Sequence, residues 1–133
     1  MRLLVVEDEQ LVGMFLREVL GDAGYCVTLA NDAESALTLV PGTDFDAAIL
    51  DITLPGLKGD ELARRYRASC TVLPIILATG LSQREFTQTL STDKHLQILE
   101  KPYDTGAVLS CLEFLGVRPA YPRAEIGAPA TNC

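Results

Sequence analysis

Acidic side chains stand directly after two of the short apolar runs in this chain of 133 residues. Glu7 and Asp8 follow the first run, and Asp51 follows a later one. Carboxylates that meet in one place repel one another, so a hard cation is needed to keep them ionised at neutral pH. Mg²⁺ prefers oxygen ligands and leaves positions for water and phosphate oxygens. The three acids therefore predict a cation site suited to phosphoryl transfer, with capping of the following helices as the ordinary alternative.

A lysine and a threonine follow or end two further apolar runs. Lys101 adds a fixed positive charge that can pair with a carboxylate at rest and with a phosphoryl oxygen after transfer. Pro102 restricts the Lys101 backbone to extended conformations, and the bond between the two residues can be cis. Thr79, followed by Gly80, offers a hydroxyl that can donate to a phosphoryl oxygen. The ordinary alternatives are a surface lysine before a helix and a threonine that merely ends a strand.

Residues 51–59 read Asp-Ile-Thr-Leu-Pro-Gly-Leu-Lys-Gly and form the most specific motif of the chain. An apolar run ends on Asp51, and a Leu-Pro-Gly turn follows it. Gly59 then allows a tight backbone approach before the next helix. Within this loop, Thr53 is placed to present its backbone carbonyl to a cation bound at Asp51.

Five predicted strands and five predicted helices alternate along the chain and must bring these residues together. The apolar runs that predict buried strands are residues 3–6, 26–29, 47–50, 74–78 and 96–99. The amphipathic stretches that predict helices are residues 9–22, 32–40, 58–68, 82–91 and 104–116. This alternation predicts an α/β fold with a parallel sheet and helices on both faces. Ligand sites in such sheets lie beyond the carboxyl ends of the strands, where all the residues named above would collect.

Charge and composition exclude several classes of function. The net charge of −7 argues against direct binding to nucleic acid or to an anionic membrane. The sequence has no signal-peptide pattern and no apolar run long enough to cross a membrane. Four widely spaced cysteines predict unpaired thiols in a reduced, cytoplasmic protein. Three prolines and no periodicity in residues 117–133 predict a flexible tail or truncated linker after a domain of residues 1–116.

Over residues 2–116 these motifs together resemble the receiver domain of bacterial two-component response regulators. The resemblance rests on the acid pair after the first run, the motif D-x-x-L-P-G-x-x-G at Asp51, and the pairs Thr79-Gly80 and Lys101-Pro102. The fold it implies is the flavodoxin-like (βα)5 doubly wound parallel sheet with strand order 2-1-3-4-5.

The resemblance also implies roles for the site residues. Asp51 would accept a phosphoryl group from the phosphohistidine of a sensor histidine kinase or a histidine phosphotransfer protein. Lys101 and Thr79 would contact the new phosphoryl group, and the domain would switch conformation to control a partner or to form a homodimer. It would catalyse its own phosphorylation and dephosphorylation without being an enzyme on an external substrate. The ligands of Mg²⁺ or Mn²⁺ would be Asp8, Asp51, Glu7 mainly through water, and the backbone carbonyl of Thr53.

One departure from the family pattern, at Ile98, leaves an alternative open. Ile98 occupies the position of an aromatic residue that usually moves inward with the threonine, so the sequence leaves the coupling between these two positions open. A receiver-like interaction scaffold that takes no phosphate is therefore one alternative. A phosphatase of the haloacid-dehalogenase type is disfavoured, because such enzymes have a second aspartate where this chain has Thr53. The first helix also carries an apolar stripe at Leu11, Met14 and Phe15, which is either a contact surface for the phosphodonor or entirely buried.

Overall fold

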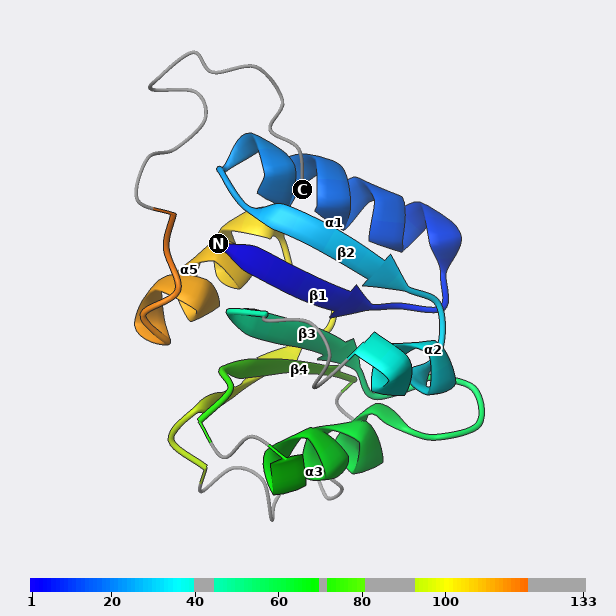
Figure 1. The fold of residues 1–133 in the computed structure, drawn as a ribbon. Helices are drawn as coiled ribbons and strands as arrows, with labels where there is room; N and C mark the ends of the chain where they lie inside the picture. Colours follow the sequence, from blue (N-terminus) through cyan, green and yellow to red (C-terminus); the bar gives the residue numbers. More distant parts are fainter. Residues whose placement is uncertain (40–44, 70–71, 81–92, 120–133) are drawn as a thin grey trace.

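The computed structural model describes residues 1–39, 45–69, 72–80 and 93–119, which form one parallel sheet with helices on both faces (Figure 1). The sheet has the order β2-β1-β3-β4-β5, as the family resemblance implied. The strands are β1 (Arg2–Val6), β2 (Cys26–Ala30), β3 (Ala47–Asp51), β4 (Ile75–Thr79) and β5 (Leu96–Glu100). The helices are α1 (Gln10–Asp22), α2 (Ala33–Leu39), α3 (Gly59–Ser69) and α5 (Thr105–Phe114). The helix predicted for residues 82–91 lies outside the described residues.

Alternate residues of each central strand enter two separate cores, which is why the strands are apolar without interruption. Leu4 and Val6 of β1 face a core under α2 and α3, which also contains Tyr66 and Ile75. Leu3 and its alternate neighbours face a second core under α1 and α5. All five residues of β3 and of β4 are buried. The sheet is therefore held from both sides, and its strand ends are fixed relative to one another.

Two buried tyrosine hydroxyls join distant parts of the chain. The Tyr66 hydroxyl on α3 donates to the Ala36 carbonyl oxygen on α2 at 2.8 Å. The Tyr25 hydroxyl donates to the Val117 carbonyl oxygen at 2.6 Å. Val117, which the sequence assigned to the tail, is 3% exposed and packs in the second core. The packed structure thus extends past residue 116, whereas residues 120–133 lie outside the described part of the chain.

The cysteines differ from the expectation of unpaired thiols. Cys111 on α5 is a free thiol, and burial raises its pKa. Cys26 at the start of β2 is disulfide-bonded, so the expectation is wrong for this residue.

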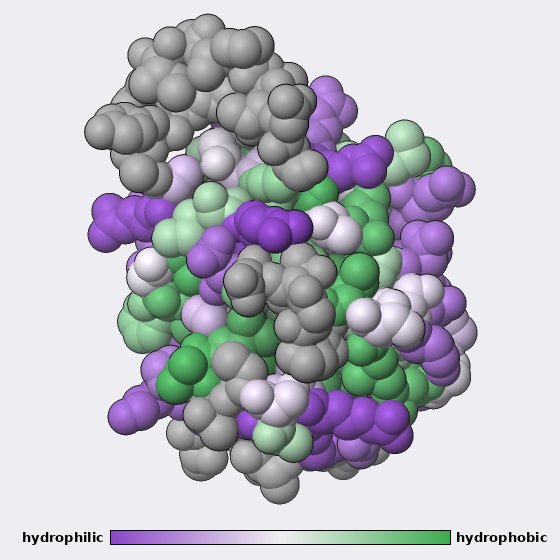
Figure 2. Space-filling view, in the orientation of Figure 1, coloured by the Kyte–Doolittle hydropathy of each residue, from purple (hydrophilic) through white to green (hydrophobic). Residues whose placement is uncertain are grey.

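The surface carries both apolar and hydrophilic side chains. Apolar side chains reach the surface on the face shown in Figure 2, where they are bordered by hydrophilic ones. Leu11 and Phe15 of α1 are 82% and 57% exposed, so the alternative of an entirely buried stripe on α1 is wrong. Among the described residues, no helix is long and apolar enough to cross a membrane.

Gly59, the first residue of α3, supports the loop that follows β3. Its amide donates to the Ile52 carbonyl oxygen at 3.2 Å. A Cβ added at this position would overlap the backbone of Asp51 and Ile52. The motif glycine is therefore required for close backbone approach beneath the end of β3.

We expect Gly59→Ala to lower the free energy of unfolding by about 1–3 kcal/mol, because the backbone of β3 must shift to admit the methyl group. Gly21→Ala in α1 is the matched control, since its Cβ would meet no atom within 4 Å. The control should leave stability unchanged or raise it by about 0.5 kcal/mol through helix propensity. Urea unfolding measures both variants, and equal stabilities would contradict the predicted overlap.

Candidate functional site

The carboxyl edge of the sheet brings the predicted acids together. Glu7 and Asp8 directly follow β1, and Asp51 is the last residue of the neighbouring strand β3. Each of the three offers a carboxylate oxygen within 4.8 Å of the others. Glu7 and Asp51 are 6% and 4% exposed, whereas Asp8 faces solvent. The arrangement is an acidic cluster with two buried members and one accessible member.

Lys101 places a positively charged side chain beside the acidic cluster. Its Nζ lies 2.9 Å from Oδ2 of Asp51, and the lysine side chain is 31% exposed. The Lys101 backbone amide donates to the Thr79 carbonyl oxygen at 2.8 Å, which fixes the lysine beside the end of β4. The Lys101–Pro102 peptide bond is cis, one of the two forms that the sequence allowed. A strand end and a loop together hold this charge against Asp51.

Thr53 holds the other oxygen of Asp51. Its backbone amide donates to Oδ1 of Asp51 at 3.0 Å, and its hydroxyl donates to the same oxygen at 2.9 Å. This is an Asx-type turn, in which an aspartate accepts from the residue two positions on. The sequence predicted a role only for the Thr53 carbonyl, although an aspartate followed two residues later by threonine is a signal for this turn. The carbonyl as a cation ligand stays a prediction.

The surroundings of the two buried acids shift their pKa values in opposite directions. Burial alone would raise the pKa of Asp51, but hydrogen bonds from Lys101, Thr53 and Glu7 outweigh it and hold the pKa below the ordinary value. For Glu7, burial and then the hydrogen bond and charge of Asp51 raise the pKa to about 8. Without a cation, Asp51 therefore carries the negative charge and Glu7 retains a proton at neutral pH.

The donor set fits a hard divalent cation. It consists of carboxylate oxygens, and the group found among the described residues contains no thiol or imidazole. Oxygen-only sets of this kind suit Mg²⁺ or Mn²⁺ rather than softer metals. Burial, reinforced by the neighbouring Asp51, raises the pKa of Glu7, so ionising this acid is unfavourable when no cation compensates its charge.

Thr79 is placed beside this cluster by the sheet register. Asp51 pairs with Ala78 across β3 and β4, so Thr79 lies one residue beyond the partner of Asp51. The Thr79 side chain is fully buried, and its hydroxyl donates to the Gly80 carbonyl oxygen at 3.0 Å. Among the described residues, a Cβ added at Gly80 would meet nothing within 4 Å.

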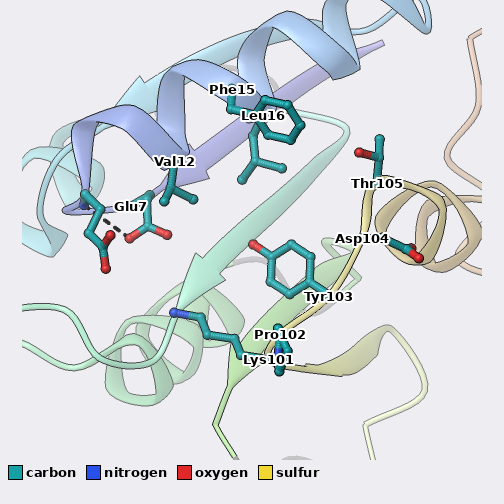
Figure 3. A pocket seen from close by; sticks show the side chains of 10 residues that line it. Glu7, Val12, Phe15, Leu16, Lys101, Pro102, Tyr103, Asp104 and Thr105 are labelled. Atoms are coloured by element: carbon teal, nitrogen blue, oxygen red, sulfur yellow. Dashed lines mark hydrogen bonds between the residues drawn. The ribbon is translucent and has the colours of Figure 1, made fainter.

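A cavity of about 640 Å³ opens between α1 and the segment that joins β5 to α5 (Figure 3). Glu7 and Lys101 line its charged end, while Val12 and Phe15 of α1 contribute apolar wall. Tyr103 forms much of the opposite wall and was not singled out from the sequence. The available signal was an aromatic residue two positions after the site lysine.

Comparisons with known proteins agree with this geometry. The family model described as "response regulator receiver domain" matches residues 3–113 of this chain. The transcriptional regulatory protein FixJ of Bradyrhizobium diazoefficiens is 30% identical over 128 residues, covering 96% of this chain and 62% of FixJ. Response regulator MprA of Mycobacterium leprae is 42% identical over 118 residues, covering 86% of this chain and 50% of MprA. The chain thus spans only part of the curated relatives it matches.

Solved structures show the same fold. The chemotaxis protein CheY4 of Vibrio cholerae has a TM-score of 0.78 at 27% identity, covering 86% of this chain and 97% of that one. A receiver domain protein from Clostridium thermocellum has a TM-score of 0.79 at 18% identity, covering 96% and 98%, and speaks for the fold alone. With the family match over residues 3–113, the strand order and the acidic cluster at the sheet edge, the chain belongs to the response regulator receiver domains of two-component signalling.

Proposed function

We propose that Asp51 is the phosphoacceptor of this receiver domain. The phosphoryl donor is the phosphohistidine of a sensor histidine kinase or of a histidine phosphotransfer protein. The observation that carries the proposal is the state of the Asp51 carboxylate. It is buried, ionised, and held at one oxygen by Lys101 and at the other by Thr53, next to two further acids.

The transfer step follows from this geometry. An oxygen of Asp51 attacks phosphorus, and the new O–P bond forms as the P–N bond to the donor imidazole breaks. The electron pair of the broken bond stays on the imidazole nitrogen. A depressed pKa keeps Asp51 ionised and ready to attack over the whole neutral range. Lys101 is then placed to pair with a phosphoryl oxygen as negative charge builds up.

Glu7, Asp8, Asp51 and the carbonyl of Thr53 would hold Mg²⁺ or Mn²⁺. Such a cation, when bound, neutralises the crowded carboxylates and the oxygens of the transferred group. Its binding requires Glu7 to give up the proton that it retains in the cation-free protein. Asp8, the exposed member of the cluster, is the ligand most accessible to an arriving cation.

The domain would report phosphorylation through Thr79. Its hydroxyl, now given to Gly80, would turn toward the phosphoryl group and move the chain after β4. Ile98 on β5 packs partly buried against the first core, so an apolar side chain replaces the usual ring there. The moved surface would control a protein partner or a homodimer contact, without direct binding to nucleic acid or membrane and in the cytoplasm.

The scaffold alternative has no support in the site. A domain that no longer took phosphate would have no need for a buried carboxylate held at both oxygens, with a lysine and a threonine beside it. We likewise expect no turnover of external phosphate esters, since Thr53 stands where a phosphatase of the haloacid-dehalogenase type has its second aspartate.

We expect one phosphoryl increment in intact mass after incubation with acetyl phosphate and Mg²⁺. Asp51→Asn should abolish it, because the amide cannot attack phosphorus. Asp46→Asn is the matched control, as Asp46 is exposed and lies at the opposite end of β3. A phosphoryl increment retained in Asp51→Asn, or none in the wild type, would refute the proposal.

We expect Lys101→Met to lower the free energy of unfolding at pH 7 without Mg²⁺, by on the order of 1–3 kcal/mol. The variant leaves the buried Asp51 carboxylate without its charged donor. The folded-state pKa of Asp51 lies below its ordinary value of 3.8, so its stabilisation is present above about pH 4 and is lost as pH falls through the folded-state pKa.

The difference between wild type and Lys101→Met should therefore be constant near neutrality and shrink below about pH 4. Urea unfolding across pH 3–7 measures it, with the exposed Lys58→Met as control. If the difference at pH 3 equals that at pH 7, the stabilisation does not come from the ionised Asp51.

A further inference from the structure

Tyr103 lies between the candidate site and the second core. It follows the cis bond at Lys101–Pro102, and its ring packs against the core under α1 and α5. Its hydroxyl points into the cavity, toward the end that carries Glu7 and Lys101 (Figure 3). The residue thus places a hydrogen-bonding group on the wall opposite α1, in the cavity that Lys101, the partner of Asp51, also lines.

The three tyrosines in the described part of the chain differ in what their hydroxyls do. Tyr25 and Tyr66 are buried, and each donates to a backbone carbonyl oxygen, at 2.6 and 2.8 Å respectively. Buried tyrosine hydroxyls ordinarily find such a partner. The hydroxyl of the half-buried Tyr103 has no hydrogen-bond partner among the described residues. Its donor is therefore available to a molecule that enters the cavity.

The electrostatic surroundings of Tyr103 agree with this placement. Burial, and then the charges of Glu7 and Asp51, raise its pKa to about 12. The effect of these carboxylates shows that the hydroxyl lies close to the acidic cluster. It also keeps the hydroxyl protonated near neutral pH, so that it acts as a donor. A neutral donor suits a site where a phosphoryl group must approach several carboxylates.

We propose that the Tyr103 hydroxyl binds the incoming phosphoryl donor, by donating a hydrogen bond to a phosphoryl oxygen in the cavity between α1 and the β5–α5 segment. This rests on the proposed function of Asp51 as acceptor. Lys101 approaches Asp51 from the end of β5, while Tyr103 reaches the same space from the cavity wall. The ligand class is a small phosphorylated donor, either an acyl phosphate or a phosphoramidate.

The test compares Tyr103→Phe with the wild type, using acetyl phosphate as the donor at fixed Mg²⁺. The phenyl ring keeps the packing against the second core and removes only the hydroxyl. We expect the half-saturating concentration of acetyl phosphate to rise about fivefold, the factor that corresponds to one ordinary hydrogen bond. The plateau rate should stay within twofold. The dissociation constant of Mg²⁺, measured by titration calorimetry without donor, should not change.

Tyr66→Phe is the matched control. It removes a hydroxyl that donates to Ala36 between α3 and α2, away from the cavity. This variant should lose stability and keep the donor dependence of the wild type, which is the reverse of the pattern expected for Tyr103→Phe. A hydroxyl with a merely structural role would behave as Tyr66 does.

Two results would overturn the inference while leaving Asp51 as the acceptor. One is an unchanged half-saturating donor concentration in Tyr103→Phe. The other is a weaker affinity for Mg²⁺ that accounts for slower phosphorylation, since it would assign the hydroxyl to the cation site. If the wild type takes no phosphoryl group from acetyl phosphate, both the proposed function and this inference fail.

Discussion

The structure depends on the burial of two carboxylates, Glu7 and Asp51, within one small volume at the edge of a sheet. Burial and mutual repulsion disfavour ionisation of both acids at once, and their pKa values are shifted in opposite directions. Asp51 receives the lysine and both donors of Thr53, and its charge is stabilised. Glu7 accepts a 3.3 Å hydrogen bond from the Glu9 amide, but burial and the neighbouring Asp51 raise its pKa and it keeps its proton. Under the proposed function, a bound cation would take the place of that proton.

A parallel sheet is well suited to impose this constraint. The acids and Lys101 come from the ends of strands that are far apart in sequence, and the strand order β2-β1-β3-β4-β5 places those ends along one edge. Separate cores on the two faces keep the strands from shifting under the repulsion. Gly59 allows α3 to start directly against the backbone of Asp51. If the packing of the two cores or the close contact at Gly59 were lost, we expect the carboxylates to move apart, because separation lowers the repulsion between them.

Hydrophobic periodicity and the residues at the strand ends were enough to predict the fold and the position of the acidic cluster. Uninterrupted apolar runs indicated two-sided burial, and the acids after them indicated the cluster. Features that depend on long-range partners escaped prediction. Nothing near Val117 signals that Tyr25, 92 positions away, will bond to its carbonyl. The four cysteines are widely spaced in the sequence, and their spacing did not predict the disulfide at Cys26. The Asx turn at Thr53 is local, and the spacing of Asp51 and Thr53 in the sequence permits it, but the same spacing also suits a carbonyl ligand to a cation.

The two faces of the sheet divide the work of the site. Ile98 on β5 packs against the first core, whereas Tyr103, five residues on, packs against the second. The two therefore lie on opposite sides of the sheet, and the ring of Tyr103 does not replace the aromatic side chain missing at position 98. If Thr79 moves on phosphorylation as proposed, Ile98 or the backbone itself would have to transmit that movement on the first face. Under the proposed function, the donor would enter the cavity on the second face, so entry of the phosphoryl group and its readout would take place on different faces of the sheet.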